Sequence, residues 1–418
     1  MSDAIDPRKS GLLDEIDTEP ADVSLDKQSL ATEAVSTDSD PFAAHRKALQ
    51  ALSRRNRYRT LSTRQGIDFS SNDYLGLAAS DALRTAMRDA LGSQDIAVGS
   101  GGSRLLRGHT DEHEALESEA ADFFGSETAL YFTSGFQANA AVLGTLPQRG
   151  DLIVYDELIH ASAHEGMALS KAATQAVPHN DCNAFEAALR GHRRDNSKGT
   201  AWIVVESLYS MDGDIAPLHD LAQLSAKYSC VLIIDEAHAT GVFGPNGRGL
   251  AADLEGRGDV ITLHTCGKAL GTMGGLVCAP RIARDFLINR ARGFIYATAP
   301  PPLACFAVRA ALRLIRQSPA WQRELDDLVQ HAAAGLQSRL GITPSPSQIQ
   351  PVILGSETRA LAAAQTIQRA GFDVRAIRPP TVPNGTSRLR ISINRNVTHT
   401  DIDRLIDTIA EAISEPNS

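Results

Sequence analysis

The sequence predicts an α/β protein with a mostly parallel central sheet in a large domain and a smaller α+β domain at the C-terminal end. From about residue 127 onward, short apolar runs bounded by turn residues alternate with longer stretches that suit helices. A proline run at residues 300–302 then marks a break, and the helix-rich segment beyond it ends in an amphipathic helix. These two observations carry the prediction.

Six apolar runs are expected to form strands that are buried on both faces, because each is short and almost free of polar residues. They are Ala129–Phe132, Leu152–Tyr155, Trp202–Val205, Val231–Ile234, Val260–Leu263 and Gly275–Cys278. The stretches between them leave room for crossover helices, which favours parallel pairing of the strands.

Two helices can be bounded from the sequence. Thr110 is a suitable N-cap, Asp111 and Glu112 suit a first turn, and Gly125 can end the helix. Near the C-terminus, Thr400 is the expected N-cap of a second helix. One apolar face of that helix is traced by Ile402, Leu405, Ile406, Ile409 and Ile413.

The chain is expected to divide into four parts. Residues 1–40 hold 11 Asp and Glu against 3 Lys and Arg and contain no aromatic residue, so they are expected to be a disordered acidic tail. Residues 41–98 form an N-terminal arm, whose basic stretch up to Arg59 is expected to be mostly a solvated helix face. The large domain is expected at residues 99–298 and the small domain at residues 299–418.

Charge and composition argue against several classes of partner. The net charge is −9, and 8 of these negative charges lie in the acidic tail (11 minus 3), so the rest of the chain is nearly neutral and has no broad basic field for nucleic acid. No apolar run approaches the roughly 18 residues that cross a bilayer. The N-terminus resembles no targeting signal, and the five scattered cysteines suggest reduced thiols, so a cytoplasmic protein is expected.

Polar residues follow five of the expected strands. In doubly wound sheets, ligands bind beyond the carboxyl ends of the strands, so we expect these residues to line one cleft. They are Thr133 with Ser134 and Gly135, His160, Glu206 with Ser210, Asp235 with His238, and His264 with Thr265 and Lys268.

Lys268 and Asp235 indicate the chemistry of this cleft. Most lysines are surface charges, but Lys268 follows an apolar strand among glycines, where loss of solvent lowers the pKa of the amine and favours a nucleophile. A cofactor with a reactive carbonyl, such as pyridoxal 5′-phosphate, would suit it. Asp235 at a strand end is either a helix N-cap or a buried carboxylate that pairs with the pyridine nitrogen of this cofactor.

Three other motifs are weaker. Asp235–His238 also spells a helicase-type box, but no phosphate-binding GxxxxGK[ST] loop precedes it. His160 and His164 have the spacing of a helical metal pair but lack the Glu of an HExxH motif, so no metal site is expected. Gly99–Ser103 follows no clear strand and is read as a place where the backbone passes close to a ligand.

Six stretches, in order, resemble the α-oxoamine synthases, which are pyridoxal-phosphate enzymes of fold type I. The resemblance extends from about residue 45 to residue 415 and implies the PLP-dependent transferase fold. The stretches are Phe69–Leu77, Gly99–Arg104, Ser134–Asn139, Ser210–Asp214, Asp235–His238 and Thr265–Lys268.

The resemblance implies a role for each residue around the cofactor ring. Lys268 would bind the cofactor covalently and move protons, Asp235 would pair with the pyridine nitrogen, and His160 would stack on the ring. Ser210 and His238 would approach the phenolic oxygen.

The resemblance also implies phosphate and amino-acid contacts. Thr265, with the backbone of Gly135 and Phe136, would hold the cofactor phosphate. Thr298 would reach the phosphate of the neighbouring subunit in a homodimer with shared active sites. Arg390 would clamp the carboxylate of the amino-acid substrate, a task that suits a bidentate guanidinium.

Within the family, Ile377–Pro383 is similar to the version found in the biotin-pathway members. These condense L-alanine with a pimeloyl thioester of coenzyme A or of acyl carrier protein and release CO₂ and the thiol. Arg378 and Arg55 are the expected partners of the distal acyl carboxylate, and Asn72 is expected near the substrates. Cys266 and His264 depart from the usual family pattern, which leaves room for a different substrate.

The alternatives are therefore other members of the family, which make 5-aminolevulinate, 2-amino-3-ketobutyrate or sphingoid bases. An aminotransferase or aldolase of the same fold type is a more distant alternative, and so is a non-catalytic interaction protein on the same scaffold.

Overall fold

The computed structural model describes residues 40–93, 95–195 and 198–414. By its internal contacts the chain forms two units, Met1–Arg59 and Thr60–Ser418. In the first unit, helix α1 (Ala43–Arg54) has no buried residue, in agreement with the expected solvated face. Apart from Asp40, the expected acidic tail lies outside the described residues.

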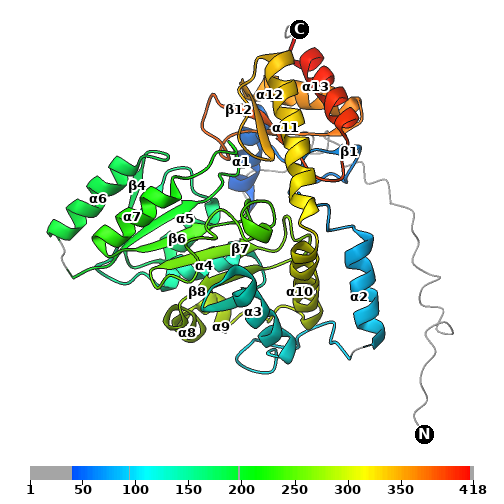
Figure 1. Ribbon diagram of the computed structural model, residues 1–418. Helices are drawn as coiled ribbons and strands as arrows, with labels where there is room; N and C mark the ends of the chain where they lie inside the picture. The colour runs from blue at the N-terminus through cyan, green and yellow to red at the C-terminus, as the bar shows by residue number, and fades with distance from the viewer. Residues whose placement is uncertain (1–39, 94, 196–197, 415–418) are drawn as a thin grey trace. The chain divides into compact units, whose positions relative to one another are not determined.

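A seven-stranded sheet forms the centre of the second unit (Figure 1). All neighbouring strands pair in parallel except β8, which is antiparallel to both of its neighbours. In spatial order the strands are β2 (Thr128–Phe132), β8 (Gly275–Ala279), β7 (Val260–Thr265), β6 (Val231–Asp235), β5 (Ala201–Glu206), β3 (Leu152–Asp156) and β4 (Ala173–Val177). The six expected strands and the mostly parallel sheet are confirmed.

The sequence reasoning missed β4, for a clear physical reason. This strand lies at the edge of the sheet, and four of its five residues are exposed. Its sequence, ATQAV, therefore lacks the continuous apolar character of the buried strands.

Helices cover both faces of the sheet, and alternate strand residues pack into two separate cores. Ile233 belongs to the core that includes Val142 of α4, whereas Leu232 and Ile234 belong to the core that includes Leu221 of α7. The helices of this part are α3 (Asp111–Phe124), α4 (Gly135–Thr145), α5 (Ala161–Leu169), α6 (Cys182–Asp195), α7 (Leu218–Tyr228), α8 (Arg281–Arg290) and α9 (Arg292–Ile295), with a 3₁₀ turn at Pro245–Gly247. Helix α3 begins after Thr110 and ends at Gly125, as the sequence predicts.

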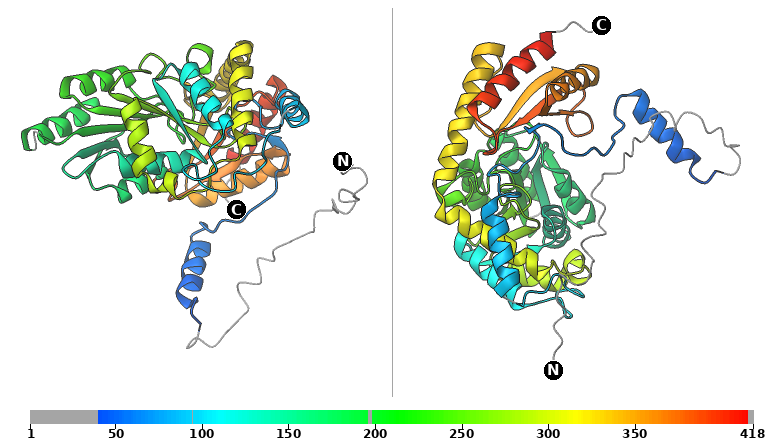
Figure 2. Two further views of the ribbon diagram at one scale, coloured as in Figure 1. Left: turned by 90° about the horizontal axis from the view of Figure 1, so that it is seen from below. Right: turned by 90° about the vertical axis from the view of Figure 1, so that its right-hand side faces the viewer.

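The C-terminal part packs three helices with a three-stranded antiparallel sheet, seen at the yellow-to-red end of the chain in Figure 2. The sheet has the order β11 (Arg375–Ile377), β12 (Ser387–Ser392) and β9 (Ile349–Gly355). The helices are α11 (Ala320–Leu340), α12 (Glu357–Arg369) and α13 (His399–Ser414), and α10 (Pro302–Gln317), which precedes them, packs against α3. Helix α2 (Asp81–Ser93) and a short parallel pair, β1 (Ile67–Asp68) with β10 (Phe372–Asp373), complete the second unit.

The prediction that Thr400 is the N-cap of the last helix is wrong. Helix α13 begins at His399, so Thr400 lies inside it. Thr398 takes the capping role instead, because its hydroxyl accepts a hydrogen bond from the backbone of Asp401 while the Asp401 carboxylate accepts from Thr398. The Asp three residues after Thr398 was the available signal.

Among the residues that the structure describes, no helix combines the length and apolarity that crossing a bilayer requires.

Candidate active site

Lys268 lies in the turn that follows β7, and its Nζ is 2.9 Å from Nε2 of His238. Burial lowers the pKa of the Lys268 amine to about 8, and the positive charge of Arg390 acts in the same direction. The carboxylates of Asp235 and Glu206 oppose this shift. The amine is therefore much closer to its nucleophilic form at neutral pH than an ordinary lysine.

Asp235 is the last residue of β6, and its carboxylate is buried. Oδ1 accepts a hydrogen bond from the backbone N–H of Ala237 at 2.9 Å, and Oδ2 accepts from Nδ2 of Asn139 at 2.7 Å. No cation in the described part of the chain forms an ion pair with Asp235. A buried carboxylate without a cation is suited to a positively charged ligand group.

Asn139 links Asp235 to His160, a connection that the sequence reasoning missed. The Asn139 amide also donates to Oγ of Ser162 at 3.0 Å, and this hydroxyl lies 2.7 Å from Nδ1 of His160. Burial lowers the pKa of His160, which keeps its ring neutral. The signal for Asn139 was a polar residue among the otherwise apolar buried residues of α4.

Tyr74 connects three of the remaining residues and was also missed. Its hydroxyl lies 2.6 Å from Nδ1 of His238 and 3.0 Å from Oδ1 of Asn72, and it accepts a hydrogen bond from Nη2 of Arg390 at 3.2 Å. Burial, together with the charge of Lys268, lowers the pKa of His238 well below its ordinary value. Tyr74 is fully buried, and the sequence around it, NDYLGL, has no periodic pattern that would have indicated a polar role for its hydroxyl.

Arg390 lies on β12 and is almost completely buried. Its Nε donates to the carbonyl oxygen of Ser210 at 2.6 Å, and Nη1 donates to Oγ of Ser392 at 2.7 Å. Within the described residues, no carboxylate forms an ion pair with it. A buried guanidinium in this state is suited to the carboxylate of a substrate.

Glu206 ends β5 beside this cluster. Its side chain is buried, and its Oε1 has no hydrogen-bond partner in the described part of the chain. Burial raises the pKa of Glu206 to about 8, and the charge of Asp235 adds to the effect. A carboxyl group that is partly protonated near neutral pH can donate a hydrogen bond to a ligand in the cleft.

Gly135 and Thr265 meet at the first turn of α4. A Cβ on Gly135 would clash with Cγ2 of Thr265, so only glycine allows this approach. Ser134 caps the helix by accepting from the backbone of Gln137, and the first N–H groups of a helix have no partner within it. Gly135, Phe136 and Thr265 therefore form a cradle suited to a phosphate group.

Three expected residues have no contact with this cluster that the structure shows. Thr298 is exposed and pairs with Ser103 through an isolated bridge, so its expected contact with a second subunit stays a prediction. Arg378 is half-buried directly after β11. Arg55 follows α1 in the first unit. The acyl-group roles of both arginines stay predictions.

His264 does not join the cleft, which corrects the expectation for this strand end. It is fully buried, its ring stacks on Phe124 at 3.6 Å, and its Nε2 lies 2.9 Å from Glu255. Because successive residues of a strand point to opposite faces, His264 packs against Phe124 whereas Thr265 points to the other face, toward Gly135.

A second polar cluster supports the loop that carries Ser210. His179 lies 2.9 Å from Oδ1 of Asp156 through Nδ1 and 2.6 Å from Oδ2 of Asp214 through Nε2. These two carboxylates outweigh burial and raise the pKa of His179 to about 10. On the other side, Arg388 forms an ion pair with Asp212 of the same loop. No group of three or more His, Cys, Asp or Glu side chains suited to a metal ion occurs in the described residues.

Comparisons with known proteins agree on one family. The model of aminotransferase class I and II matches residues 64–409. The 8-amino-7-oxononanoate synthase of Anaeromyxobacter sp. (strain K) is 43% identical over 84% of this chain and 87% of its own length, and that of Paraburkholderia xenovorans is 41% identical over 88% and 96%. The chain belongs to the 8-amino-7-oxononanoate synthase family.

Solved structures support the same assignment. The 8-amino-7-oxononanoate synthase of Francisella tularensis superposes with a TM-score of 0.68 at 28% identity, covering 83% of this chain and 97% of that one. A serine palmitoyltransferase of S. paucimobilis with bound PLP–myriocin reaches a TM-score of 0.80 at 26% identity, covering 89% and 97%. The resemblance to the α-oxoamine synthases and the PLP fold type I are thus confirmed, and the chain is a pyridoxal-phosphate enzyme of the 8-amino-7-oxononanoate synthase family.

Proposed function

We propose that this enzyme condenses L-alanine with a pimeloyl thioester to give 8-amino-7-oxononanoate, CO₂ and the free thiol, in biotin biosynthesis. The observation that carries the proposal is the Lys268 amine, which contacts His238 and whose pKa is influenced by the charges of two buried groups, the Asp235 carboxylate and the Arg390 guanidinium. Neither of these two groups forms an ion pair with another residue that the structure describes. This arrangement offers separate places for a cofactor, an amine and a carboxylate. The choice of L-alanine and a pimeloyl thioester as substrates follows from the relatives that are named 8-amino-7-oxononanoate synthase.

The residues present fit pyridoxal 5′-phosphate. The cradle of Gly135, Phe136 and Thr265 would hold its phosphate, and Asp235 would hold a proton at the ring nitrogen. His160 would cover one ring face, and Ser210 with His238 would lie near the phenolic oxygen. When bound, this cofactor supplies a carbonyl that takes up amines and a ring that stabilises negative charge at the α-carbon of an amino acid.

Side chains of the enzyme would bind the substrates, transfer protons and keep the amine of Lys268 oriented. Arg390 would bind the carboxylate of L-alanine and fix which bond at the α-carbon faces the ring, which is a positioning role. The Lys268 amine would remove the α-proton and later return a proton to the product. His238 would keep the Lys268 amine oriented through their 2.9 Å contact. Arg378 and Arg55 would receive the distal carboxylate of the pimeloyl group.

We further propose that the active enzyme is a cytoplasmic homodimer in which Thr298 of one subunit completes the phosphate site of the other. The exposure of Thr298 supports this proposal, because a hydroxyl at that position is available to a second chain.

The substrate assignment can be tested by measuring thiol release. The purified, cofactor-loaded enzyme would be given pimeloyl, succinyl, acetyl and palmitoyl thioesters of coenzyme A, each with alanine, glycine and serine. We expect the highest kcat/KM for alanine with the pimeloyl thioester, with a product of the mass of 8-amino-7-oxononanoate. A preference for glycine with succinyl thioester, or for serine with palmitoyl thioester, would replace the proposal by another reaction of the family.

A further inference from the structure

Two carboxyl groups lie side by side at the carboxyl ends of β5 and β6. Glu206 is the last residue of β5 and the register partner of Asp235, the last residue of β6. Neighbouring strands of a sheet are about 5 Å apart, and residues in register direct their side chains to the same face. Glu206 is 2% exposed and Asp235 is 6% exposed. Two buried carboxylates at this distance repel each other strongly, which favours a proton on one of them.

The hydrogen bonds of the two groups place the negative charge on Asp235 and the proton on Glu206. Both oxygens of Asp235 accept a hydrogen bond, one from the backbone of Ala237 and one from Asn139. Glu206 accepts one from the backbone of Ser210, and its Oε1 has no partner among the residues that the structure describes. A buried carboxylate oxygen without a donor is unfavourable, whereas a protonated carboxyl group supplies a donor of its own.

The charges around Glu206 favour the same assignment. Burial raises the pKa of Glu206 to about 8, and the carboxylates of Asp235 and Asp156 act in the same direction. The amine of Lys268 opposes this shift. Its own charge is weakened, however, because burial lowers the pKa of this amine to about 8.

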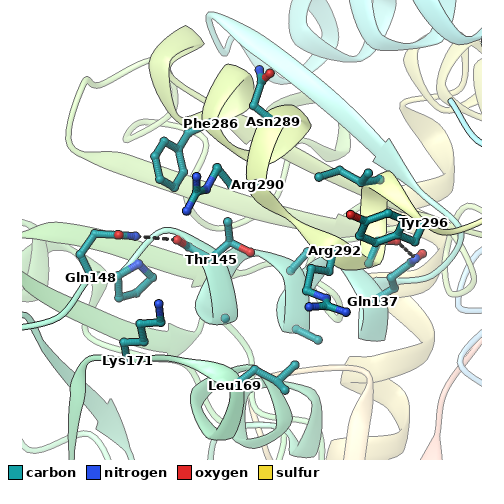
Figure 3. Close-up of a pocket in the computed structure, with 16 residues that line it drawn as sticks. Gln137, Thr145, Gln148, Leu169, Lys171, Phe286, Asn289, Arg290, Arg292 and Tyr296 are labelled. Carbon is teal, nitrogen blue, oxygen red and sulfur yellow. Dashed lines mark hydrogen bonds between the residues drawn. The ribbon is translucent and has the colours of Figure 1, made fainter. Parts of the chain in front are cut away.

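Helix α4 separates the two carboxyl groups from a group of cations on its other side. Its Asn139 donates to Asp235, whereas its Gln137 lines a hollow of about 630 Å³. The cations that line the same hollow are Lys171, Arg290 and Arg292 (Figure 3). These three cations lie beyond α4 and do not neutralise Glu206.

We propose that Glu206 is a catalytic residue that stays protonated in the cofactor-loaded enzyme and donates a hydrogen bond to the phenolic oxygen of the cofactor. The proposal rests on the proposed function, in which Asp235 holds the ring nitrogen and Ser210 with His238 lie near the phenolic oxygen. Glu206 accepts a hydrogen bond from the backbone of Ser210. Its charge also acts on the hydroxyl of Tyr74, which lies 2.6 Å from Nδ1 of His238. These interactions place Glu206 beside the groups that would surround this oxygen.

A neutral donor at the phenolic oxygen has the opposite effect from a carboxylate. A hydrogen bond from the acid stabilises negative charge on that oxygen and so weakens its hold on the proton of the neighbouring link between Lys268 and the cofactor. A carboxylate would repel this negative charge and strengthen the hold on the proton. The pH at which the link loses its proton changes the visible absorbance of the cofactor, and it therefore reports the charge of Glu206.

The test follows this absorbance between pH 6 and pH 10 in the natural chain and in two variants. The amide in Glu206→Gln keeps a donor of nearly the same size as the neutral acid, so the midpoint should stay close to that of the natural chain. Glu206→Leu removes the donor, and loss of a hydrogen bond to a charged oxygen should move the midpoint about one pH unit toward alkaline pH. Glu411→Gln is the matched control, because Glu411 is exposed on α13 outside the site.

Three results would overturn the proposal. A midpoint of Glu206→Gln that moves toward acidic pH would show that the natural side chain is a carboxylate. An unchanged midpoint in Glu206→Leu would show that the side chain makes no hydrogen bond to the cofactor. An equal alkaline shift in both variants would show that the amide does not replace a neutral donor.

An infrared measurement decides the protonation state without the Leu variant. The spectrum of the cofactor-loaded natural chain minus that of Glu206→Gln, at pH 7, should contain the C=O stretch of a protonated carboxyl group, which shifts in D₂O. A carboxylate band in its place would contradict the proposal. If the natural chain gains no visible absorbance with pyridoxal phosphate, the proposed function fails. If it gains this absorbance but the midpoints differ from the expected pattern, only the role of Glu206 fails.

Discussion

The 2.9 Å contact between Nζ of Lys268 and Nε2 of His238 couples the protonation of the amine to the tautomer of the imidazole. Burial keeps His238 neutral, so only one of its nitrogens carries a proton. A charged Lys268 donates to Nε2, which places the ring proton on Nδ1 next to Tyr74. A neutral Lys268 can accept from Nε2–H, and the Tyr74 hydroxyl, 2.6 Å from Nδ1, must then donate to that nitrogen.

Tyr74→Phe should therefore slow the reaction without disturbing the fold. The change removes the only described side-chain partner of Nδ1 and one of the hydrogen bonds of Arg390. Loss of a hydrogen bond to a charged group costs about 1.5–3 kcal/mol, so kcat/KM for alanine should fall roughly 10- to 100-fold. Tyr228→Phe is the control, because its hydroxyl donates to Glu186 of α6 and does not belong to the catalytic cluster. Steady-state kinetics check this, and equal values for both variants would remove Tyr74 from the site.

Gly135→Ala should weaken cofactor binding, because the new methyl group would clash with Cγ2 of Thr265 in the phosphate cradle. Adding Thr265→Ser removes that methyl group and keeps the hydroxyl, so the double variant should recover much of the affinity. Gly191→Ala is the control, since a Cβ there meets nothing. Titration of each apoprotein with pyridoxal phosphate, followed by absorbance, gives the affinities. A loss that Thr265→Ser fails to repair would argue against the cradle.

The capture of pyridoxal phosphate by the apoprotein should depend on pH with a midpoint near 8. Only the neutral amine of Lys268 reacts with the carbonyl, and its pKa is lowered to about 8, so the rate should rise between pH 7 and pH 9. Arg390→Gln should move the midpoint upward, because it removes a positive charge that lowers this pKa. Stopped-flow absorbance measures the rate. A midpoint near the ordinary lysine value of 10.5 would contradict the burial of Lys268.

His179→Gln should lower stability and flatten its dependence on alkaline pH. The pKa of His179 is raised from 6.5 to about 10, so its contribution to stability is complete below about pH 6.5 and is lost as pH rises through 10. Because His179 is half-buried, its loss should cost less than the loss of one partner of a fully buried pair, on the order of 1 kcal/mol. Urea unfolding at pH 6 and pH 10 measures both effects. An equal pH-dependent loss in the natural chain and the variant would show that His179 is not the titrating group.

The sequence predicted the central sheet well because its strands are buried on both faces and therefore almost purely apolar. It predicted Lys268 and Asp235 because strand ends in such a sheet are where polar residues converge. Edge strand β4 was not predicted, because an exposed strand lacks the continuous apolar run that marks a buried one.

The contacts that organise the site were harder to foresee. Asn139, Tyr74 and His179 act through partners 96, 164 and 35 residues away in the chain, and such pairings leave no local periodicity. His264 looked like another strand-end residue, and only the alternation of the strand directs it to Phe124 in the core.

The most direct test of the central claim is to reduce the cofactor-loaded enzyme with borohydride and locate the fixed pyridoxyl group by peptide mass spectrometry. We predict that the added mass lies on Lys268 and that Lys268→Ala abolishes both the labelling and the product. A pyridoxyl group on any other lysine, or a Lys268→Ala variant that still turns over at the natural rate, would contradict it.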